Sequence, residues 1–288
     1  MRWLRAPAKV NLALRVVGRR ADGYHELESL VAFAGLCDWL GFDPGDGLTL
    51  EVLGPRAREV GPVHENLVVR AVRSLTMRIP GLRLGWFRLV KRLPVAAGLG
   101  GGSADAAAAL RLVAADAGLP VDDPRVLASA QATGADVLAC LSSQARTIKG
   151  IGSELGPALL LPDTFAVLVN PRVPALTPKV FAAFDLAPKP KAETRFRRIP
   201  AEEFGPAPIL DFRAFGNNDL EAAAIRVAPQ IETVLERLSQ IAEAKAFGMS
   251  GSGATCFALF DDRRSAAAAR RSVAAEHSEW WVAATKLH

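Results

Sequence analysis

The chain has 288 residues, of which 50% are hydrophobic and 23% charged, so it has the composition of a globular protein and the length for one large domain or two small ones. Neither a membrane span nor a signal peptide is expected, because no apolar run reaches roughly 18 residues and basic residues interrupt the N-terminal apolar positions. Three scattered cysteines exclude a disulfide framework or a zinc site and favour a cytoplasmic location.

The net charge of +5 raises the question of a nucleic-acid partner. Lys and Arg are spread along the chain, however, with few aromatic residues among them, whereas a nucleic-acid-binding surface gathers its basic residues on one face. A basic balance suits small anionic ligands equally well. We therefore expect a small-molecule ligand, and no nucleic-acid or membrane partner.

The first predicted strand covers Val10 to Val16, where apolar positions recur with a period of two. This period places Lys9 and Asn11 on the same face. A lysine near the start of a strand is usually solvated, unless an anionic group lies opposite.

An Asp-Gly pair in RRADGYHE, residues 19–26, predicts a turn that leads into a second apolar segment at 27–36. Tyr24, the only tyrosine, and His25 lie in this turn. They are either ordinary residues of a surface hairpin, or a ring and an imidazole that contact a flat nucleobase.

The most constrained segment is PVAAGLGGGSADAAAAL at 94–110. Before it, residues 42–63 predict strands joined by exposed turns, 65–77 a helix, and 82–91 a strand that leads into the loop. Glycines at 98, 100, 101 and 102 lack the Cβ atoms that would prevent tight curling, so consecutive N–H groups can converge on one anion.

Ser103 is predicted to cap a helix that runs from Ala104 to about Ala117. A loop that leads into a helix N-terminus favours a polyphosphate. The segment matches neither GxxxxGK[ST] nor GxGxxG, which excludes a Walker loop and a Rossmann turn. The alternatives are a phosphate cradle of another type and a plain glycine-rich turn.

A short helix is predicted from Asp123-Pro124 to Gly134, and Asp136 follows it in TGADVLACLSS. Asp136 is either an N-cap, which is the commoner role for such a residue, or the anionic partner of Lys9.

The C-terminal half alternates strands and helices, which predicts an α+β class. A domain junction is expected near 150–162, and a charged, Pro-rich connection at 187–208. The predicted strands lie at 165–170, 255–260 and 280–284, and the predicted helices lie at 178–184, 219–227, 229–244 and 263–276.

Taken together, several motifs resemble those of the GHMP kinases, and they follow in the family's order over nearly the whole chain. The motifs are PAKVNLAL at 7–14, RADGYHEL at 20–27, PVAAGLGGGSADAA at 94–107, GAD at 134–136, Thr177-Pro178, NDLE at 218–221 and SGSGA at 250–254. The glycine loop alone indicates only the superfamily. The DGYH segment beside AKVNL points to the member that acts on a cytidyl substrate.

The resemblance implies an α+β, two-domain fold, with a nucleotide-binding domain at 1–155 that carries a βαβ glycine loop, and a ferredoxin-like α/β sandwich at 156–288. It also implies an activity that uses ATP and Mg²⁺. The expected reaction transfers the γ-phosphoryl group to the C2 hydroxyl of CDP-methylerythritol, in the non-mevalonate isoprenoid pathway.

By the same resemblance, Asp136 is the general base and Lys9 its charged partner. Nucleotide binding is expected at Asn66, Lys91, Pro94, Gly98, Leu99, Gly100, Gly101, Gly102 and Ser103. Substrate binding is expected at Asn11, Tyr24, His25, Asp136, Thr177, Phe181, Gly251, Ser252 and Gly253, with the rings of Tyr24, His25 and Phe181 at the cytosine.

One position departs from the family pattern, because Leu138 stands where a proline commonly follows the catalytic aspartate. Leucine restores an N–H and leaves the backbone less restricted. No acidic residue is assigned to the magnesium ion by spacing, and Ser103 is the candidate ligand.

Three other functions compete with this hypothesis. The first is another GHMP kinase, which phosphorylates homoserine, mevalonate or a sugar. The second is a binding protein on the same scaffold that has lost catalysis, which the presence of both Lys9 and Asp136 opposes. The third is a nucleic-acid-binding domain, which the scattered charges oppose.

Overall fold

The computed structural model describes residues 1–186 and 218–288, so the predicted connection at 187–208 lies outside the described residues. Its strands are β1 (Arg2–Arg19), β2 (His25–Asp43), β3 (Leu48–Leu53), β4 (Gly85–Val90), β5 (Arg146–Gly150), β6 (Glu154–Ala158), β7 (Thr164–Asn170), β8 (Ala246–Met249), β9 (Cys256–Phe260) and β10 (Trp281–Leu287). Its α-helices are α1 (Leu67–Thr76), α2 (Gly101–Asp116), α3 (Pro124–Thr133), α4 (Ala135–Ser142), α5 (Thr177–Asp185), α6 (Glu221–Val227), α7 (Gln230–Ser239) and α8 (Arg263–Glu276).

β2 is the strand to which most of the fold is attached. It pairs along its length with β1, at residues 27–31 with β5, at 39–43 with β4, and at Ala34 with β10. The sheet continues from β2 through β10, β7 and β9 to β8, and in the other direction through β4 to β3. The helices and strands together confirm the predicted α+β class.

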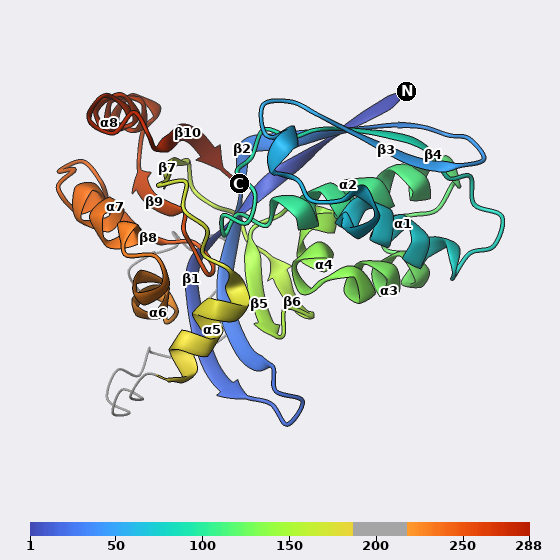
Figure 1. Ribbon diagram of the computed structural model, residues 1–288, viewed down its shortest axis with the longest axis horizontal. Helices are drawn as coiled ribbons and strands as arrows, with labels where there is room; N and C mark the ends of the chain where they lie inside the picture. Colours follow the sequence, from blue (N-terminus) through green and yellow to red (C-terminus); the bar gives the residue numbers. More distant parts are fainter. Residues whose placement is uncertain (187–217) are drawn as a thin grey trace.

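The helices form two groups on either side of the long β1–β2 ribbon (Figure 1). α1 to α4 pack together on one side, whereas α6, α7 and α8 lie with β7 to β10 on the other. None of the helices in residues 1–186 and 218–288 is long and apolar enough to cross a membrane. The predicted boundary near residue 155 stays a prediction.

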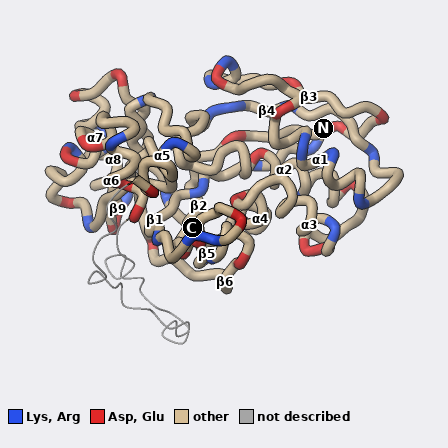
Figure 2. Tube along the Cα trace, turned by 60° about the horizontal axis from the view of Figure 1, so that its bottom comes forward, with Lys and Arg blue, Asp and Glu red and all other residues tan. Residues whose placement is uncertain are grey.

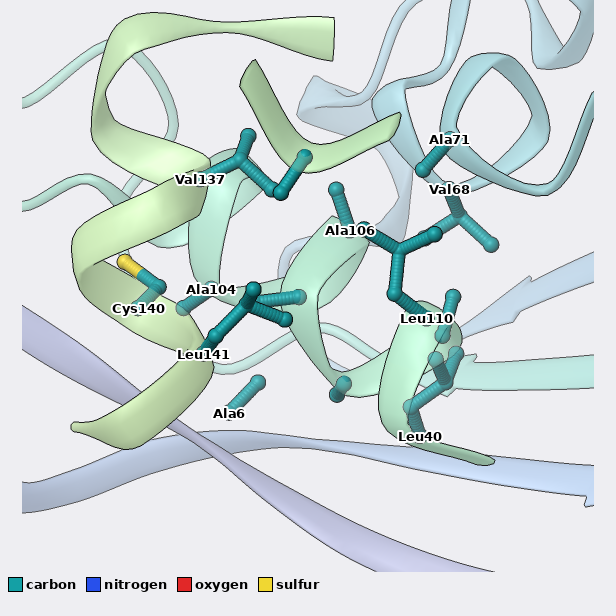
Figure 3. Packing of buried hydrophobic residues seen from close by; sticks show 14 of the residues in the cluster. Ala6, Leu40, Val68, Ala71, Ala104, Ala106, Leu110, Val137, Cys140 and Leu141 are labelled. Atoms are coloured by element: carbon teal, nitrogen blue, oxygen red, sulfur yellow. The ribbon is translucent and has the colours of Figure 1, made fainter. Parts of the chain in front are cut away.

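α2 is the central helix of the first group, and its alanines explain how it can be buried on nearly every side. Ala104, Ala106 and Leu110 pack against side chains from α1, α4 and the strands (Figure 3). Small side chains allow neighbouring helices to approach closely, and a helix that is apolar all round belongs in a core. This packing fixes the position of the helix end that faces the glycine loop.

The predicted elements are confirmed in most places, but α4 was not predicted, and three further differences follow. β1 and β2 are much longer than the alternating segments at 10–16 and 27–36. The expected junction near 150–162 contains β6, which forms a hairpin with β5, and β5 pairs with β2. β8 was missed, because its four residues are too few to establish a period.

Basic and acidic residues are interspersed along the chain that the structure describes (Figure 2). Many are paired with each other at the surface, as Arg88 is with Glu51 and Arg237 with Glu276. The excess of positive charge is thus distributed over the molecule.

Candidate active site

Lys9 and Asp136 form an ion pair beside the glycine loop. Lys9 Nζ donates to Asp136 Oδ1 at 2.7 Å, and 6% of the lysine side chain is exposed, against 39% of the aspartate side chain. The backbone N–H of Lys9 donates to the carbonyl oxygen of Leu99 at 2.8 Å, which joins β1 directly to the loop. The interpretation of Asp136 as the anionic partner of Lys9 is therefore confirmed.

Asp136 is the second residue of α4, and Gly134 is the N-cap of that helix. The alternative interpretation of Asp136 as an N-cap is therefore wrong. Its Oδ1 is held by Lys9, whereas its Oδ2 has no hydrogen-bond partner among the described residues. A Cβ atom on Gly100 would lie 3.8 Å from this Oδ2, so the free oxygen faces the glycine loop.

The glycine loop, residues 98–102, has the backbone conformation that its sequence predicts. Gly98 and Gly100 have φ values of +76° and +59°, a region that glycine enters without a steric penalty. α2 begins at Gly101 with Gly100 as its N-cap and no side chain capping it. The prediction that Ser103 caps the helix is therefore wrong, because Ser103 is its third residue.

The uncapped end of α2 leaves backbone donors for a ligand. The first N–H groups of a helix have no carbonyl partner within the helix, and the helix dipole adds partial positive charge there. An anion placed against Gly101, Gly102 and Ser103 would satisfy these groups. The loop and helix end therefore fit a phosphate chain.

The loop is seated on the turn at residues 250–254. Ser250 Oγ donates to the carbonyl oxygen of Gly98 at 2.9 Å, and Thr255 N donates to that of Ala97 at 3.2 Å. A Cβ on Gly98 would lie only 2.3 Å from the carbonyl oxygen of Ser250. The glycine at 98 is thus required by the close approach of a segment about 150 residues away in the chain.

Asn11 lies between the two segments and keeps one polar atom free. Its backbone N–H donates to Ser250 Oγ at 3.0 Å, and its Nδ2 donates to Ser29 Oγ at 2.8 Å. Its buried Oδ1 has no hydrogen-bond partner in the described parts of the chain. A Cβ on Gly251 would lie 3.3 Å from this oxygen. Asn11 therefore offers an acceptor beside the turn at 250–254.

Asn218 holds that turn in place, which sequence reasoning did not foresee for this residue. Its Nδ2 donates to the carbonyl oxygens of Met249 at 2.9 Å and Gly251 at 2.6 Å. Within the described residues, Ser252 Oγ bonds Thr177 Oγ1 at 2.8 Å, which connects the turn to the start of α5. The only sequence signal for Asn218 was its place in NDLE.

The predicted base-binding residues gather at the far end of α5. The ring of His25 stacks on that of Phe181, with centroids 4.7 Å apart and an interplanar angle of 22°. Tyr24 precedes His25 in the chain and is 65% exposed, so its ring is accessible to solvent. Thr177 and Phe181 lie one helical turn apart on α5, and together they link this end of the site to Ser252.

A buried ionic cluster under the loop was missed by the sequence analysis. Lys91 Nζ donates to Asp38 Oδ2 at 2.6 Å and to Asp105 Oδ2 at 2.7 Å, and all three side chains are at most 5% exposed. Asp38 Oδ1 also accepts from the backbone N–H groups of Arg92 and Leu93, at 2.5 and 2.9 Å. The cluster ties β2, the chain after β4, and α2 together where the loop starts.

This cluster determines the placement of Lys91. Burial alone would lower the pKa of Lys91, but the negative charges of Asp105 and Asp38 raise it, so the ammonium stays charged. A Cβ on Gly101 would lie 3.2 Å from Lys91 Nζ, which places the ammonium directly behind the first residue of α2. Lys91, expected at the nucleotide, is thus held by two carboxylates and supports the loop from behind.

The second carboxylate of the cluster has an unusual environment. Burial raises the pKa of Asp105 to about 7, against the opposing effect of Lys91. Its Oδ1 has no hydrogen-bond partner among the described residues. An acid inside the apolar run CDWLGF at 37–42 was the available sign of the cluster, because an acid buried in a strand needs a cation.

The other residues expected at the nucleotide lie around the loop. Asn66 is the N-cap of α1, where its Oδ1 accepts from Val68 N at 2.9 Å. A Cβ on Gly102 would lie 3.4 Å from Leu67 Cδ1, so the start of α1 adjoins the loop. Pro94 and Leu99 are buried and shape the loop rather than line it.

Within the described residues, no group of three or more His, Cys, Asp or Glu side chains could hold a metal ion. Mg²⁺ in phosphoryl-transfer sites is commonly held by substrate phosphates and water, with one or two protein ligands. An ion held in this way needs no cluster of protein carboxylates.

Comparisons with known proteins agree with this geometry. The description "GHMP kinases N terminal domain" matches residues 66–144, and "GHMP kinases C terminal" matches residues 209–279. A protein of Rhodopseudomonas palustris is 52% identical over 98% of this chain and 96% of its own length. The chain belongs to the GHMP kinase family. This GHMP kinase thus carries its glycine loop, Lys9 and Asp136 within the family's own architecture.

Two relatives that are about half identical to this GHMP kinase carry the same name. The Rhodopseudomonas palustris protein is named 4-diphosphocytidyl-2-C-methyl-D-erythritol kinase, as is a Xanthobacter autotrophicus protein that is 51% identical over 98% of each chain. A crystal structure of 4-(cytidine 5'-diphospho)-2C-methyl-D-erythritol kinase superposes with a TM-score of 0.76 at 32% identity, over 99% of each chain. A homoserine kinase from Cytophaga hutchinsonii shares the fold, with a TM-score of 0.69 at 16% identity over 98% of this chain and 93% of its own.

Proposed function

We propose that this GHMP kinase transfers the γ-phosphoryl group of ATP to the C2 hydroxyl of 4-diphosphocytidyl-2-C-methyl-D-erythritol. The observation that carries the proposal is the 2.7 Å ion pair between Lys9 and Asp136, which lies against the glycine loop at Gly100. The choice of substrate rests on the relatives that share half of the sequence over nearly the full length. The protein acts on a small molecule, in the cytoplasm.

In this proposal the ATP phosphates lie on Gly98 to Ser103, where the loop and the end of α2 offer backbone donors. Asn66 and the start of α1 border the nucleoside. Ser103 and the phosphate oxygens would hold Mg²⁺, which supplies positive charge to the phosphates when it is bound. Lys91 acts from behind the loop through Asp38 and Asp105.

The alcohol lies between Asn11, Asp136 and the turn at 251–253. The free Oδ1 of Asn11 accepts a hydrogen bond from a hydroxyl of the substrate, which satisfies a buried acceptor. Thr177 and Ser252 border the path toward α5. The cytosine reaches Tyr24, His25 and Phe181 at the end of that path, where aromatic faces suit a flat base.

The reaction follows from the two oxygens of Asp136. Oδ1 stays with Lys9, and the free Oδ2 takes the proton of the C2 hydroxyl as the hydroxyl oxygen bonds to the γ-phosphorus. The bond between the γ-phosphorus and the bridging oxygen breaks, and ADP leaves. Lys9 and the loop N–H groups stabilise the charge that spreads over the transferred group.

An ADP-release assay tests the proposal. ADP should form only when ATP, Mg²⁺ and the cytidyl substrate are all present, and ³¹P NMR should show a new phosphomonoester on the C2 oxygen. Homoserine, mevalonate and galactose should each give no release above background. Release with one of these alcohols in place of the cytidyl substrate would assign the chain to another activity of the family.

A further inference from the structure

Asp185 holds the imidazole of His25 from another part of the chain. Asp185 Oδ1 and His25 Nε2 are 2.7 Å apart, although 160 positions separate the two residues. Asp185 is the last residue of α5, and His25 is the first residue of β2. An ionised carboxylate can only accept a hydrogen bond, so His25 Nε2 is the donor and carries a hydrogen.

The surroundings of the ring leave it one orientation. His25 stacks on Phe181, and Phe184 meets it edge-on at 6.1 Å with an interplanar angle of 84°. The side chain of His25 is 10% exposed. On the other carboxylate oxygen, Asp185 Oδ2 lies 3.5 Å from Arg19 Nη1, and Arg19 pairs with His25 across the β1–β2 ribbon. A flip of the ring by 180° would keep this stacking but lose the Nε2 bond, so the bond to Asp185 selects one of the two ring orientations.

The second ring nitrogen has no such partner. His25 Nδ1 makes no hydrogen bond within residues 1–186 and 218–288. With the hydrogen held on Nε2, the Nδ1 of a neutral imidazole is an acceptor. The exocyclic amino group is the donor that cytosine carries at position 4, whereas uracil carries a carbonyl oxygen there.

We propose that Asp185 is a positioning residue that makes this GHMP kinase specific for a cytosine base. It keeps the hydrogen of His25 on Nε2 and so leaves Nδ1 to accept from the amino group of cytosine. A uracil base would place its own acceptor against Nδ1, and two acceptors repel each other. The inference rests on the proposed function, since it requires the cytidyl end of the substrate to reach His25.

A structural role for Asp185 makes a different prediction. If the carboxylate only secured the end of α5 to β2, its loss would lower kcat/KM for the cytidyl substrate and for a uridyl analogue by the same factor. The ratio of the two values of kcat/KM therefore separates discrimination between bases from general support of the site.

The experiment compares wild type, Asp185→Asn and Asp163→Asn on the cytidyl substrate and its uridine diphosphate analogue. Asp163 is an exposed carboxylate paired with Lys286, so its variant is the matched control for the loss of a surface charge. Turnover of the cytidyl substrate by wild type is measured first, and its failure would count against the proposed function. We expect Asp185→Asn to raise KM for the cytidyl substrate about tenfold, to keep kcat within about twofold, and to lower the cytidyl-to-uridyl ratio about tenfold or more.

Equal losses on the two substrates, or an unchanged ratio, would overturn the proposal. A second measurement does not depend on the folding of Asp185→Asn, because ¹⁵N NMR of the wild-type protein reports which imidazole nitrogen carries the hydrogen. The four histidines are resolved by comparison with His25→Gln. We expect hydrogen on Nε2 and a bare Nδ1 in the neutral ring, and a signal from the opposite tautomer would also overturn the proposal.

Discussion

Lys9 and Asp136 are 127 positions apart in the chain and 2.7 Å apart in space. The pair joins β1 to the first turn of α4, next to Gly100. A partner this close keeps the carboxylate oriented, while its second oxygen stays free for a proton.

Replacement of Asp136 by alanine should remove the base and leave nucleotide binding intact. We expect kcat to fall by about 10² to 10⁴, the usual contribution of a positioned base. The Kd for ATP, measured by calorimetry, should change little, because the loop donors are backbone groups. The control is Asp163→Asn, and near-normal turnover by Asp136→Ala would remove Asp136 from the mechanism.

Replacement of Lys9 by alanine should act mainly on the transition state. Charge on the transferred group is greatest there, so we expect kcat to fall by about 10² to 10³ with a modest change in KM. Steady-state kinetics with each substrate varied in turn measures both. An unaltered kcat would show that Lys9 does not stabilise the transition state and has only a structural role in β1.

Comparison of Gly98→Ala with Gly81→Ala separates two costs of an added Cβ, which are the strain of a positive φ and a steric clash with neighbouring atoms. Their φ values are similar, +76° and +81°, but a Cβ at 98 would meet the Ser250 carbonyl oxygen at 2.3 Å, whereas a Cβ at 81 meets nothing within 4 Å. Gly81→Ala should therefore lower the free energy of unfolding by about 1 to 2 kcal/mol, the cost of a left-handed alanine.

Gly98→Ala should lose more stability than this and should also raise KM for ATP, because the loop is pushed off the turn at 250–254. Urea unfolding and ATP titrations of both variants provide the measurements. Equal losses of stability in the two proteins, with normal ATP kinetics in both, would contradict the close seating of the loop.

The stability of the protein should depend on the protonation of Asp105. Burial raises its pKa from 3.8 to about 7, so the folded state holds the extra proton between these values. The contribution of Asp105 to stability is thus greatest at low pH and is lost as the pH rises toward about 7.

Asp105→Asn removes this titration, so its Tm relative to wild type should rise as the pH increases from about 5 to about 8. Thermal melts over that range measure the difference, with Asp163→Asn as the control for an exposed carboxylate. A difference in Tm that stays constant with pH would mean that Asp105 does not titrate in this window.

Loss of the Tyr24 ring should weaken binding of the cytidyl substrate and leave binding of ATP unchanged. Tyr24 is 65% exposed and directly precedes His25, which stacks on Phe181, so its ring is free to contact a base. We expect Tyr24→Ala to lower substrate affinity by roughly 1 to 3 kcal/mol, the range for stacking of one base. Titration with CDP provides the measurement, with Tyr24→Phe as the variant that should bind normally.

The sequence was sufficient where the signal was local. The alanine run predicted α2, and the four glycines predicted a loop with left-handed residues, because both depend on the backbone preferences of neighbouring residues. The start of α2 was misplaced by three residues. Ser103 suggested a side-chain cap, but the left-handed Gly100 already ends the loop.

Contacts between distant segments could not be predicted from the sequence in the same way. Asp38, Lys91 and Asp105 form one cluster, yet each is an isolated charge in its own segment, and only the folded chain shows that they are neighbours. The bond between Asp185 and His25 was hidden for the same reason. Local preference favoured Asp136 as an N-cap, and a tertiary partner prevailed.

β2 pairs with β1, β4, β5 and β10, so the groups of helices and strands on both sides of the β1–β2 ribbon are attached to it. We therefore expect neither group to unfold while the other stays folded, because both are paired with β2. A calorimetric scan should accordingly show a single endotherm, whose midpoint moves upward as a whole when either ligand is added.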